Sequence, residues 1–344
     1  MVVLARLGHW FTGAGICQSL LEEEVIFRER LVLDIQSSFY LLCLSLCFGV
    51  LPQWPAEAQE TDVIEVSPSD VPSLKAGKIE FADGGSYEGG LKLGEMHGVG
   101  ILRFANGDVY EGEFAGGQLH GQGVVTFADG DRYEGSFILG ERSGRGVYIS
   151  GDGSRYEGEF QSDEMHGRGL FSSANGDQYE GDYVGGVEEG SGVFSFANGD
   201  RYEGAVVDGR MEGHGILSLA NGDQYEGGFV GGRMHGSGKY VYSSGHIYEG
   251  NFVSGQYNGK GSLEFAAGHQ YQGEFKDGQM HGEGVLTYAS GDRYEGGFLR
   301  GLQNGFGTIY YLDGDRFEGS FVDGARKGKG TTYYANGDRL EGEY

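Results

Sequence analysis

The sequence lacks the short motifs that mark most enzymes and metal proteins. It has no EF-hand loop, no His-Glu-x-x-His, no Cys-x-x-Cys and no phosphate loop with Gly-Lys-Ser/Thr. Because glycine accounts for 69 of 344 residues, chance matches to Gly-x-Gly-x-x-Gly carry no information. No nucleophile, base and orienting acid can be nominated. We therefore predict a protein that is not an enzyme, with no catalytic residue, no cofactor and no metal site.

Cysteines and long apolar runs are also scarce. The three cysteines, Cys17, Cys43 and Cys47, all lie in residues 1–58, and the apolar run at residues 39–51 is shorter than the roughly 20 residues of a membrane-spanning helix. That run suits a signal-peptide core, with an A-x-A-like cleavage site at Ala58. Export to a periplasmic or extracellular space is the interpretation we favour, and it would remove every cysteine, hence any disulfide.

Other interpretations of residues 1–58 stay open. The leader before the apolar run carries more acidic than basic residues, which is unusual for a signal peptide. Translation that starts after residue 38 would explain this leader. An uncleaved membrane anchor or a structural amino-terminal helix are the remaining alternatives.

Basic residues are few. The chain has 25 Lys and Arg against 51 Asp and Glu; residues 1–58 hold 3 and 6 of these, which leaves 22 and 45, a net charge of −23, for the rest. Such an acidic surface repels polyanions, so we expect no nucleic-acid partner and we disfavour binding to anionic lipid. The carboxylates either solvate an outer face or attract a basic partner or loosely held divalent cations. Residues 59–77, with Pro68 and Pro72, are predicted to be an acidic linker.

One triplet, Tyr-Glu-Gly, is abundant and returns every 23 residues without insertion or deletion. Its twelve copies start at Tyr87, Tyr110, Tyr133, Tyr156, Tyr179, Tyr202, Tyr225, Tyr248, Tyr271, Tyr294, Phe317 and Leu340. A fixed period of this length indicates an array in which each unit contacts only its neighbours. We place the array at residues 78–344.

Within each unit, apolar residues alternate with period two between Gly, Asn and Asp, which predicts a β-hairpin. A three-residue loop, Ala105-Asn106-Gly107 with Gly107 left-handed, places the apolar residues of both strands on one face. A four-residue turn at residues 116–119 is expected to follow. The resulting registers place Tyr110 between Leu102 and Val125, Gly112 between Gly100 and Gly123, and Phe114 between Gly98 and Gly121.

The predicted fold is all-β, an elongated single-layer antiparallel meander of repeated hairpins. Its apolar face should carry a Tyr/Leu ridge, a glycine trough and a row of Phe rings that alternate with glycine. This face could receive an extended peptide or a partner helix, unless the rings close over the trough. The candidate partner-binding residues are Tyr110, Phe114, Tyr133, Phe137, Tyr156, Phe160, Tyr225, Phe229, Tyr248 and Phe252.

Four motifs, Tyr110-Glu-Gly-Glu-Phe, Gly117, His120-Gly-Gln-Gly and Phe127-Ala-Asp-Gly, give the chain a close resemblance to the MORN repeat family. The resemblance extends over residues 78–344. It implies a single-layer sheet of hairpins used for protein scaffolding, with membrane-lipid association also proposed for the family. Some relatives fuse such arrays to enzyme domains, but no such domain is seen in this sequence, so no catalytic residue can be transferred.

Three further sets of residues have simple structural interpretations. The recurring His at positions such as His97 and His120 lies too far from its equivalents to form one metal site, at about 9.6 Å across two strands. The Asp that follows the turn glycine, as in Asp108, suggests an Asx turn. Residues 185–208 diverge most from the repeat, either by drift or because they are tailored to a partner.

The function we predict is a scaffold or adaptor that binds a protein partner whose identity the sequence does not give. The alternative is a peripheral membrane protein that contacts lipid through its aromatic face; a regulatory module for a separate enzyme is a third possibility. We also predict a homodimer through the last strand, with Leu340 and Tyr344 at its edge, because an open edge strand invites pairing.

Overall fold

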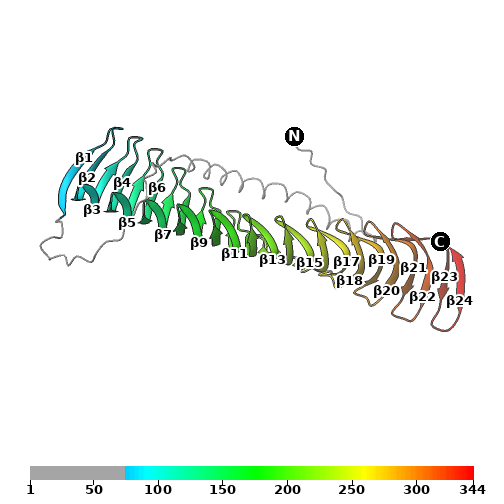
Figure 1. Ribbon diagram of the computed structural model, residues 1–344. Helices are drawn as coiled ribbons and strands as arrows, with labels where there is room; N and C mark the ends of the chain where they lie inside the picture. The colour runs from blue at the N-terminus through cyan, green and yellow to red at the C-terminus, as the bar shows by residue number, and fades with distance from the viewer. Residues whose placement is uncertain (1–73) are drawn as a thin grey trace, which may run out of the picture. The chain divides into compact units, whose positions relative to one another are not determined.

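A computed structural model describes residues 74–344 (Figure 1). The predicted leader, its cleavage site at Ala58 and the linker up to residue 73 lie outside the described residues. The described chain forms two compact units, residues 74–210 and residues 211–344. In each unit the strands are curved and follow one another in a row (Figure 1).

The first unit contains twelve strands, each hydrogen-bonded to the next in antiparallel orientation. Their bounds are β1 Lys75–Glu80, β2 Ser86–Lys92, β3 Glu95–Arg103, β4 Val109–Ala115, β5 Gln118–Thr126, β6 Arg132–Ile138, β7 Glu141–Ile149, β8 Arg155–Gln161, β9 Glu164–Ser172, β10 Gln178–Val184, β11 Val187–Ser195 and β12 Arg201–Val207. β1 starts inside the predicted linker because its backbone pairs with β2 as far as Lys75.

The second unit repeats this pattern with twelve further strands. They are β13 Arg210–Ser218, β14 Gln224–Val230, β15 Arg233–Val241, β16 Ile247–Val253, β17 Gln256–Glu264, β18 Gln270–Lys276, β19 Gln279–Thr287, β20 Arg293–Leu299, β21 Leu302–Tyr310, β22 Arg316–Val322, β23 Ala325–Tyr333 and β24 Arg339–Glu343. Residues 74–344 contain no helix. The prediction of an all-β antiparallel meander of hairpins is confirmed.

The loop between β3 and β4 has three residues, as predicted. The Phe104 N–H donates to the Asp108 carbonyl at 2.9 Å, and Gly107 (φ 100°) donates back to the Phe104 carbonyl at 3.0 Å. Leu102 therefore lies opposite Tyr110, and Gly100 lies opposite Gly112. Both apolar sets share one face, which we call the aromatic face.

The other turn differs from the prediction of four residues at 116–119. Ala115 pairs with Gln118, so the turn has two residues, and both of them, Gly116 (φ 56°) and Gly117 (φ 78°), have the positive φ of a type I′ turn. Gly121 and Gln122 of β5 then have no ladder partner on β4 and form a bulge opposite the step from Gly112 to Glu113. As a result Phe114 lies opposite Leu119 and not opposite Gly121. The type I′ turn prevails because its twist matches that of the flanking strands.

The predicted glycine trough is filled by tyrosine rings, so of the two alternatives left open the rings close over the trough. A Cβ built on Gly112 or Gly123 would overlap the ring or hydroxyl of Tyr110, so this ring lies flat over both glycines. Tyr110 is 0% exposed. Its hydroxyl donates to the Glu113 carbonyl at 2.8 Å, next to the bulge where ladder pairing is interrupted. Burial raises the pKa of Tyr110 to about 12, so the hydroxyl keeps its proton and its hydrogen bond.

We predict that Gly123→Ala destabilises the protein by about 3 kcal/mol, because the new methyl group collides with the Tyr110 ring over close-packed backbone. Gly151→Ala is the control: other repeats carry alanine there, as in Ala128, and the nearest atom to the added Cβ is 3.3 Å away. Urea denaturation followed by circular dichroism measures both midpoints. Equal midpoints for the two variants would contradict the packing of the ring over glycine.

Candidate functional site

The ten candidate partner-binding residues all lie on the aromatic face, but their side chains are buried. Tyr110, Tyr133 and Tyr248 are 0% exposed, and the most exposed of the ten, Phe160, is 4% exposed. These rings therefore form the core of each unit and cannot themselves be an open contact surface. A partner on this face would meet the side chains at its margins.

The buried rings form a ladder of edge-to-face contacts within each unit. Phe114 lies between Tyr87 and Tyr110, with ring centroids 4.9 and 5.0 Å away, and Phe137 lies between Tyr110 and Tyr133 at 5.1 and 5.2 Å. Edge-to-face pairs at such distances stabilise beyond the area they bury. Each phenylalanine therefore couples one repeat to the next.

One column of residues beside the ladder varies widely in chemistry. It lies opposite the phenylalanine column, as the pair Phe114 and Leu119 shows. In the order of the chain its members are Met96, Leu119, Arg142, Met165, Glu188, Met211, Met234, Tyr257, Met280, Gln303 and Arg326. Four of these are polar or charged, although the column lines the core.

Arg142 is 6% exposed and fully engaged. Its Nε donates to the Asp163 carboxylate at 3.1 Å, its Nη2 donates to the Asp163 carbonyl at 2.7 Å, and its guanidinium lies 5.4 Å from the Phe160 ring centroid. Asp163 adopts a left-handed backbone (φ 68°) where most repeats have glycine. The left-handed backbone of Asp163 is strained, and this strain persists because Asp163 keeps the buried guanidinium of Arg142 paired.

Glu188 is buried without such a partner. It is 4% exposed and lies opposite Tyr183, whose buried hydroxyl has no hydrogen-bond partner among residues 74–344. Desolvation raises the pKa of Glu188 to about 7, and a hydrogen bond from its own backbone partly offsets this. Val206 replaces the ladder phenylalanine in the next repeat. The divergence of residues 185–208 thus introduces a polar interruption into the core.

The opposite face is acidic. The triplet glutamates alternate with the buried tyrosines and lie exposed or half-exposed. Several pair with the arginine two residues earlier, as in Arg132–Glu134 at 2.7 Å and Arg201–Glu203 at 2.8 Å. Exposed pairs like these contribute little to stability. Glu111 has no such partner within the described chain, so this face keeps an excess of negative charge.

The aspartate that follows the turn glycine has a different role from the predicted Asx turn. Asn106 makes the Asx turn, because its Oδ1 accepts the Asp108 N–H at 3.1 Å. The Asp108 carboxylate instead accepts the Ala128 N–H of the next repeat at 2.9 Å. Asp177 binds the Ala197 N–H in the same way, at 2.7 Å. The aspartate column therefore links neighbouring loops.

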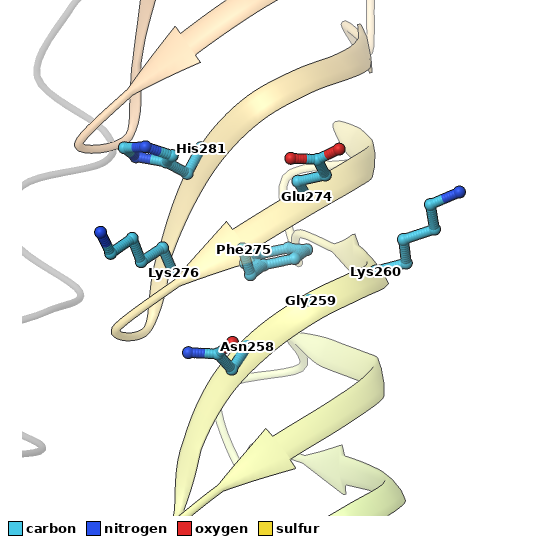
Figure 2. Close-up of a pocket in the computed structure, with 7 residues that line it drawn as sticks. All are labelled: Asn258, Gly259, Lys260, Glu274, Phe275, Lys276 and His281. Atoms are coloured by element: carbon cyan, nitrogen blue, oxygen red, sulfur yellow. The ribbon is translucent and has the colours of Figure 1, made fainter.

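A metal site and a binding pocket each place requirements on the described side chains. Across residues 74–344, no three His, Cys, Asp or Glu side chains are placed to hold one metal ion. A shallow hollow of about 400 Å³ lies over β17 to β19, where Lys260 and Lys276 point away from each other (Figure 2). The residues that line it are Asn258, Gly259, Lys260, Glu274, Phe275, Lys276 and His281. Their charged groups do not converge on a common point (Figure 2).

At the predicted dimer edge, Leu340 is 53% exposed and Tyr344 is 43% exposed. β24 pairs with β23, and the Tyr344 ring takes the place of a ladder phenylalanine, 5.0 Å from Phe317. Dimer formation through this strand stays a prediction. The described residues contain no helix that is long and apolar enough to cross a membrane.

Comparison with protein families finds a match to the MORN repeat model in eleven consecutive segments. These are residues 87–109, 110–132, 133–155, 156–178, 179–201, 202–224, 225–247, 248–270, 271–293, 294–316 and 317–339. The resemblance seen in the sequence is thereby confirmed, although the twelfth triplet lies beyond the last match. No curated protein matches the chain.

Solved structures match only weakly. The TCP domain of SAS-4 from Drosophila melanogaster, in complex with a proline-rich motif of Ana2, is 15% identical over 56% of this chain and 96% of that chain, with a TM-score of 0.29. The G-box domain of the microcephaly protein CPAP is 11% identical over 78% and 99%, with a TM-score of 0.14. A streptogramin B lyase is 11% identical over 80% and 85%, also with a TM-score of 0.14. TM-scores this low carry no argument.

We predict that Glu188→Gln makes stability less dependent on pH. Folding raises the pKa of Glu188 from 4.5 to about 7, so the folded state holds this proton more tightly than the unfolded state. The stability of the natural protein therefore falls as pH rises from about 4.5 to about 7, by about 3 kcal/mol for this group. The glutamine variant should be more stable above pH 7 and nearly equal to the natural protein at pH 4.5.

Urea midpoints at pH 4.5, 6 and 8 measure this effect. The control is Glu180→Gln, which removes an exposed carboxylate and should leave the pH profile unchanged. A Glu188→Gln profile parallel to that of the natural protein would show that the buried carboxyl is not the titrating group.

Proposed function

Because the chain belongs to the MORN repeat family, we propose that it is a non-enzymatic scaffold or adaptor that binds a protein partner along its repeats. MORN repeats typically mediate protein or membrane interactions. The proposal depends above all on one observation: the described repeats bury the tyrosine and phenylalanine ladder and expose a regular acidic face to solvent. A regular charged face suits recognition of a complementary surface and offers no cleft for chemistry.

The charge indicates the kind of partner. Residues 59–344 carry a net charge of −23, and triplet glutamates such as Glu111, Glu180, Glu226 and Glu249 make no ion pair within the described chain. Unpaired carboxylates on a sheet surface attract cations over several ångströms. We propose a partner with a basic surface.

We predict that replacing Glu111, Glu180, Glu226 and Glu249 by glutamine weakens capture of the partner about tenfold, because four unpaired charges are lost. Gln272 already occupies this column, so the change is compatible with the fold. The control replaces the paired residues Glu134, Glu157, Glu203 and Glu295. The measurement is quantitative mass spectrometry of proteins retained by the immobilised full chain at about 0.1 M salt.

The same proteins, mixed with liposomes and centrifuged through a density gradient, test the alternative of a peripheral membrane protein. A scaffold of this charge should stay in solution with neutral and with anionic lipid. Flotation with the liposomes, together with no protein captured in stoichiometric amount, would overturn the proposed function.

We further propose that the protein is exported, on the basis of the apolar run at residues 39–51 and the sequence that ends at Ala58. The expected mature protein begins at Gln59 and contains no cysteine. Intact-mass measurement of the natural protein checks this. A mass that includes residues 1–58 would contradict cleavage.

A further inference from the structure

The aromatic face of residues 211–344 has a second aromatic column, outside the buried ladder. Its members occupy the last position before each three-residue loop: the Tyr288 N–H donates to the Asp292 carbonyl at 2.8 Å, as Phe104 does to Asp108. We call this column the aromatic margin, and its members are Tyr242, Phe265, Tyr288, Tyr311 and Tyr334. Phe265 is buried, Tyr334 is 39% exposed, and the other three are half-buried. These rings lie outside the edge-to-face ladder, although the Tyr242 hydroxyl contacts that of Tyr257.

The equivalent column in residues 74–210 is interrupted. Phe104 and Phe127 are followed by Ser150 and Ser173 before an aromatic returns at Phe196. The repeat therefore folds with serine at this position, and an aromatic residue there is not required by the hairpin. Five consecutive aromatics in the second unit exceed what the fold needs.

Histidines and aspartates separate the rings of the margin. The His246 ring lies edge-to-face between Tyr242 and Phe265, with centroids 6.1 and 5.7 Å away, and His269 lies in the same way between Phe265 and Tyr288. Aspartates take the histidine position in the following loops. The side chain of Leu312, beside Tyr311, is 75% exposed. The margin is thus a row of aromatic rings separated by histidines and aspartates, with the exposed Leu312 beside Tyr311.

The spacing of the rings matches one peptide conformation. Equivalent residues lie two strands apart, about 9.6 Å at the usual strand separation. A polyproline II helix advances about 9.3 Å in each turn of three residues. Successive turns of such a helix, laid across the strands, would reach successive rings. Five rings span about 38 Å, the length of about 12 residues in this conformation.

We propose that the aromatic margin binds a proline-rich segment of a partner protein in the polyproline II conformation, with prolines against the rings that reach solvent, those of Tyr242, Tyr288, Tyr311 and Tyr334. This inference rests on the proposed function and names the class of partner. Polyproline II segments dock on aromatic-lined grooves because they are already ordered before binding. Their backbone carbonyls are free to accept hydrogen bonds.

Tyr288 can supply such a hydrogen bond. The Gln303 Nε2 donates to the Tyr288 hydroxyl oxygen at 2.9 Å, which leaves the hydroxyl proton available for another acceptor. Burial raises the pKa of Tyr288, so the hydroxyl is protonated at neutral pH. A ligand carbonyl that passes over Tyr288 would accept this proton in a hydrogen bond.

Charge complementarity predicts the charge at one end of the ligand. The five three-residue loops that follow the margin residues contain no Lys or Arg. Four aspartates lie in or directly after the last three of these loops: Asp292, Asp313, Asp315 and Asp338. Arg326 lies 5.7 Å from the Tyr311 ring centroid but 4.1 Å from that of Phe317, so it belongs to the ladder. The bound segment should therefore carry a Lys or Arg at the end that lies near Tyr334.

The test is a phage-displayed library of 12-residue peptides with proline fixed at every third position and the other positions randomised, selected on the full chain. Selected peptides should be enriched in Lys or Arg at one end. Fluorescence anisotropy then measures the affinity of a synthetic selected peptide. Tyr288→Ser combined with Tyr311→Ser should weaken binding about tenfold or more.

The matched control is Phe104→Ser combined with Phe127→Ser, the same change in the same column of the other unit, and it should leave affinity unchanged. Tyr288→Phe keeps the ring and should lose only part of the affinity. Either no enrichment from the library, or equal losses in the two serine double variants, would overturn the inference. Partner capture that persists when peptide binding is absent would leave the scaffold function intact and reject only the proline-rich ligand.

Discussion

The fold depends on one contact, the tyrosine ring that lies flat over a pair of glycines on its own sheet. A single layer has no second layer to cover its apolar face, so the sheet must bury that face with its own side chains. Tyr110 does this only because Gly112 and Gly123 have no Cβ, and its hydroxyl satisfies the Glu113 carbonyl beside the bulge. The Tyr-Glu-Gly triplet, the Gly-x-Gly pair and the bulge therefore act together to hold the tyrosine ring on the sheet. Phe317 keeps the ring position without a hydroxyl, which shows that ring packing is the essential part.

The ladder turns this local contact into stability shared between repeats. Because each phenylalanine touches the tyrosine of its own repeat and that of the preceding one, no repeat buries its rings alone. The column beside the ladder contains buried polar residues, and the free-energy cost of burying each one depends on its partners. Arg142 is paired with Asp163 and lies against aromatic rings, whereas Glu188 lies opposite Tyr183, whose hydroxyl has no hydrogen-bond partner among residues 74–344. The two adjacent repeats that contain Glu188 and Val206 are accordingly the ones whose core chemistry departs furthest from their neighbours.

Most of the fold could be predicted from the sequence because the period-two pattern determines which side chains share a face. The three-residue loop and the pairing of Tyr110 with Leu102 and Val125 follow from that pattern alone. The second turn could not be predicted in this way. A four-residue turn and a two-residue turn with a two-residue bulge place the same residues on the same face, so the pattern does not distinguish them. The burial of Glu188 was equally hidden, since a glutamate beside a turn ordinarily reaches solvent.

The difference between invariant and variable columns of the repeat indicates where function can reside in such a chain. Columns that hardly vary, such as the triplet glycine, are needed for the packing of the single layer. They cannot be changed to suit a partner without loss of the fold. Function must then lie in columns that tolerate change, namely the acidic face, the column of Arg142 and Glu188, and the margin before each loop. The margin holds Ser150 and Ser173 in one unit but five successive aromatics in the other. Four of these five aromatics keep exposed or half-exposed rings that the fold does not require, which favours a role in binding.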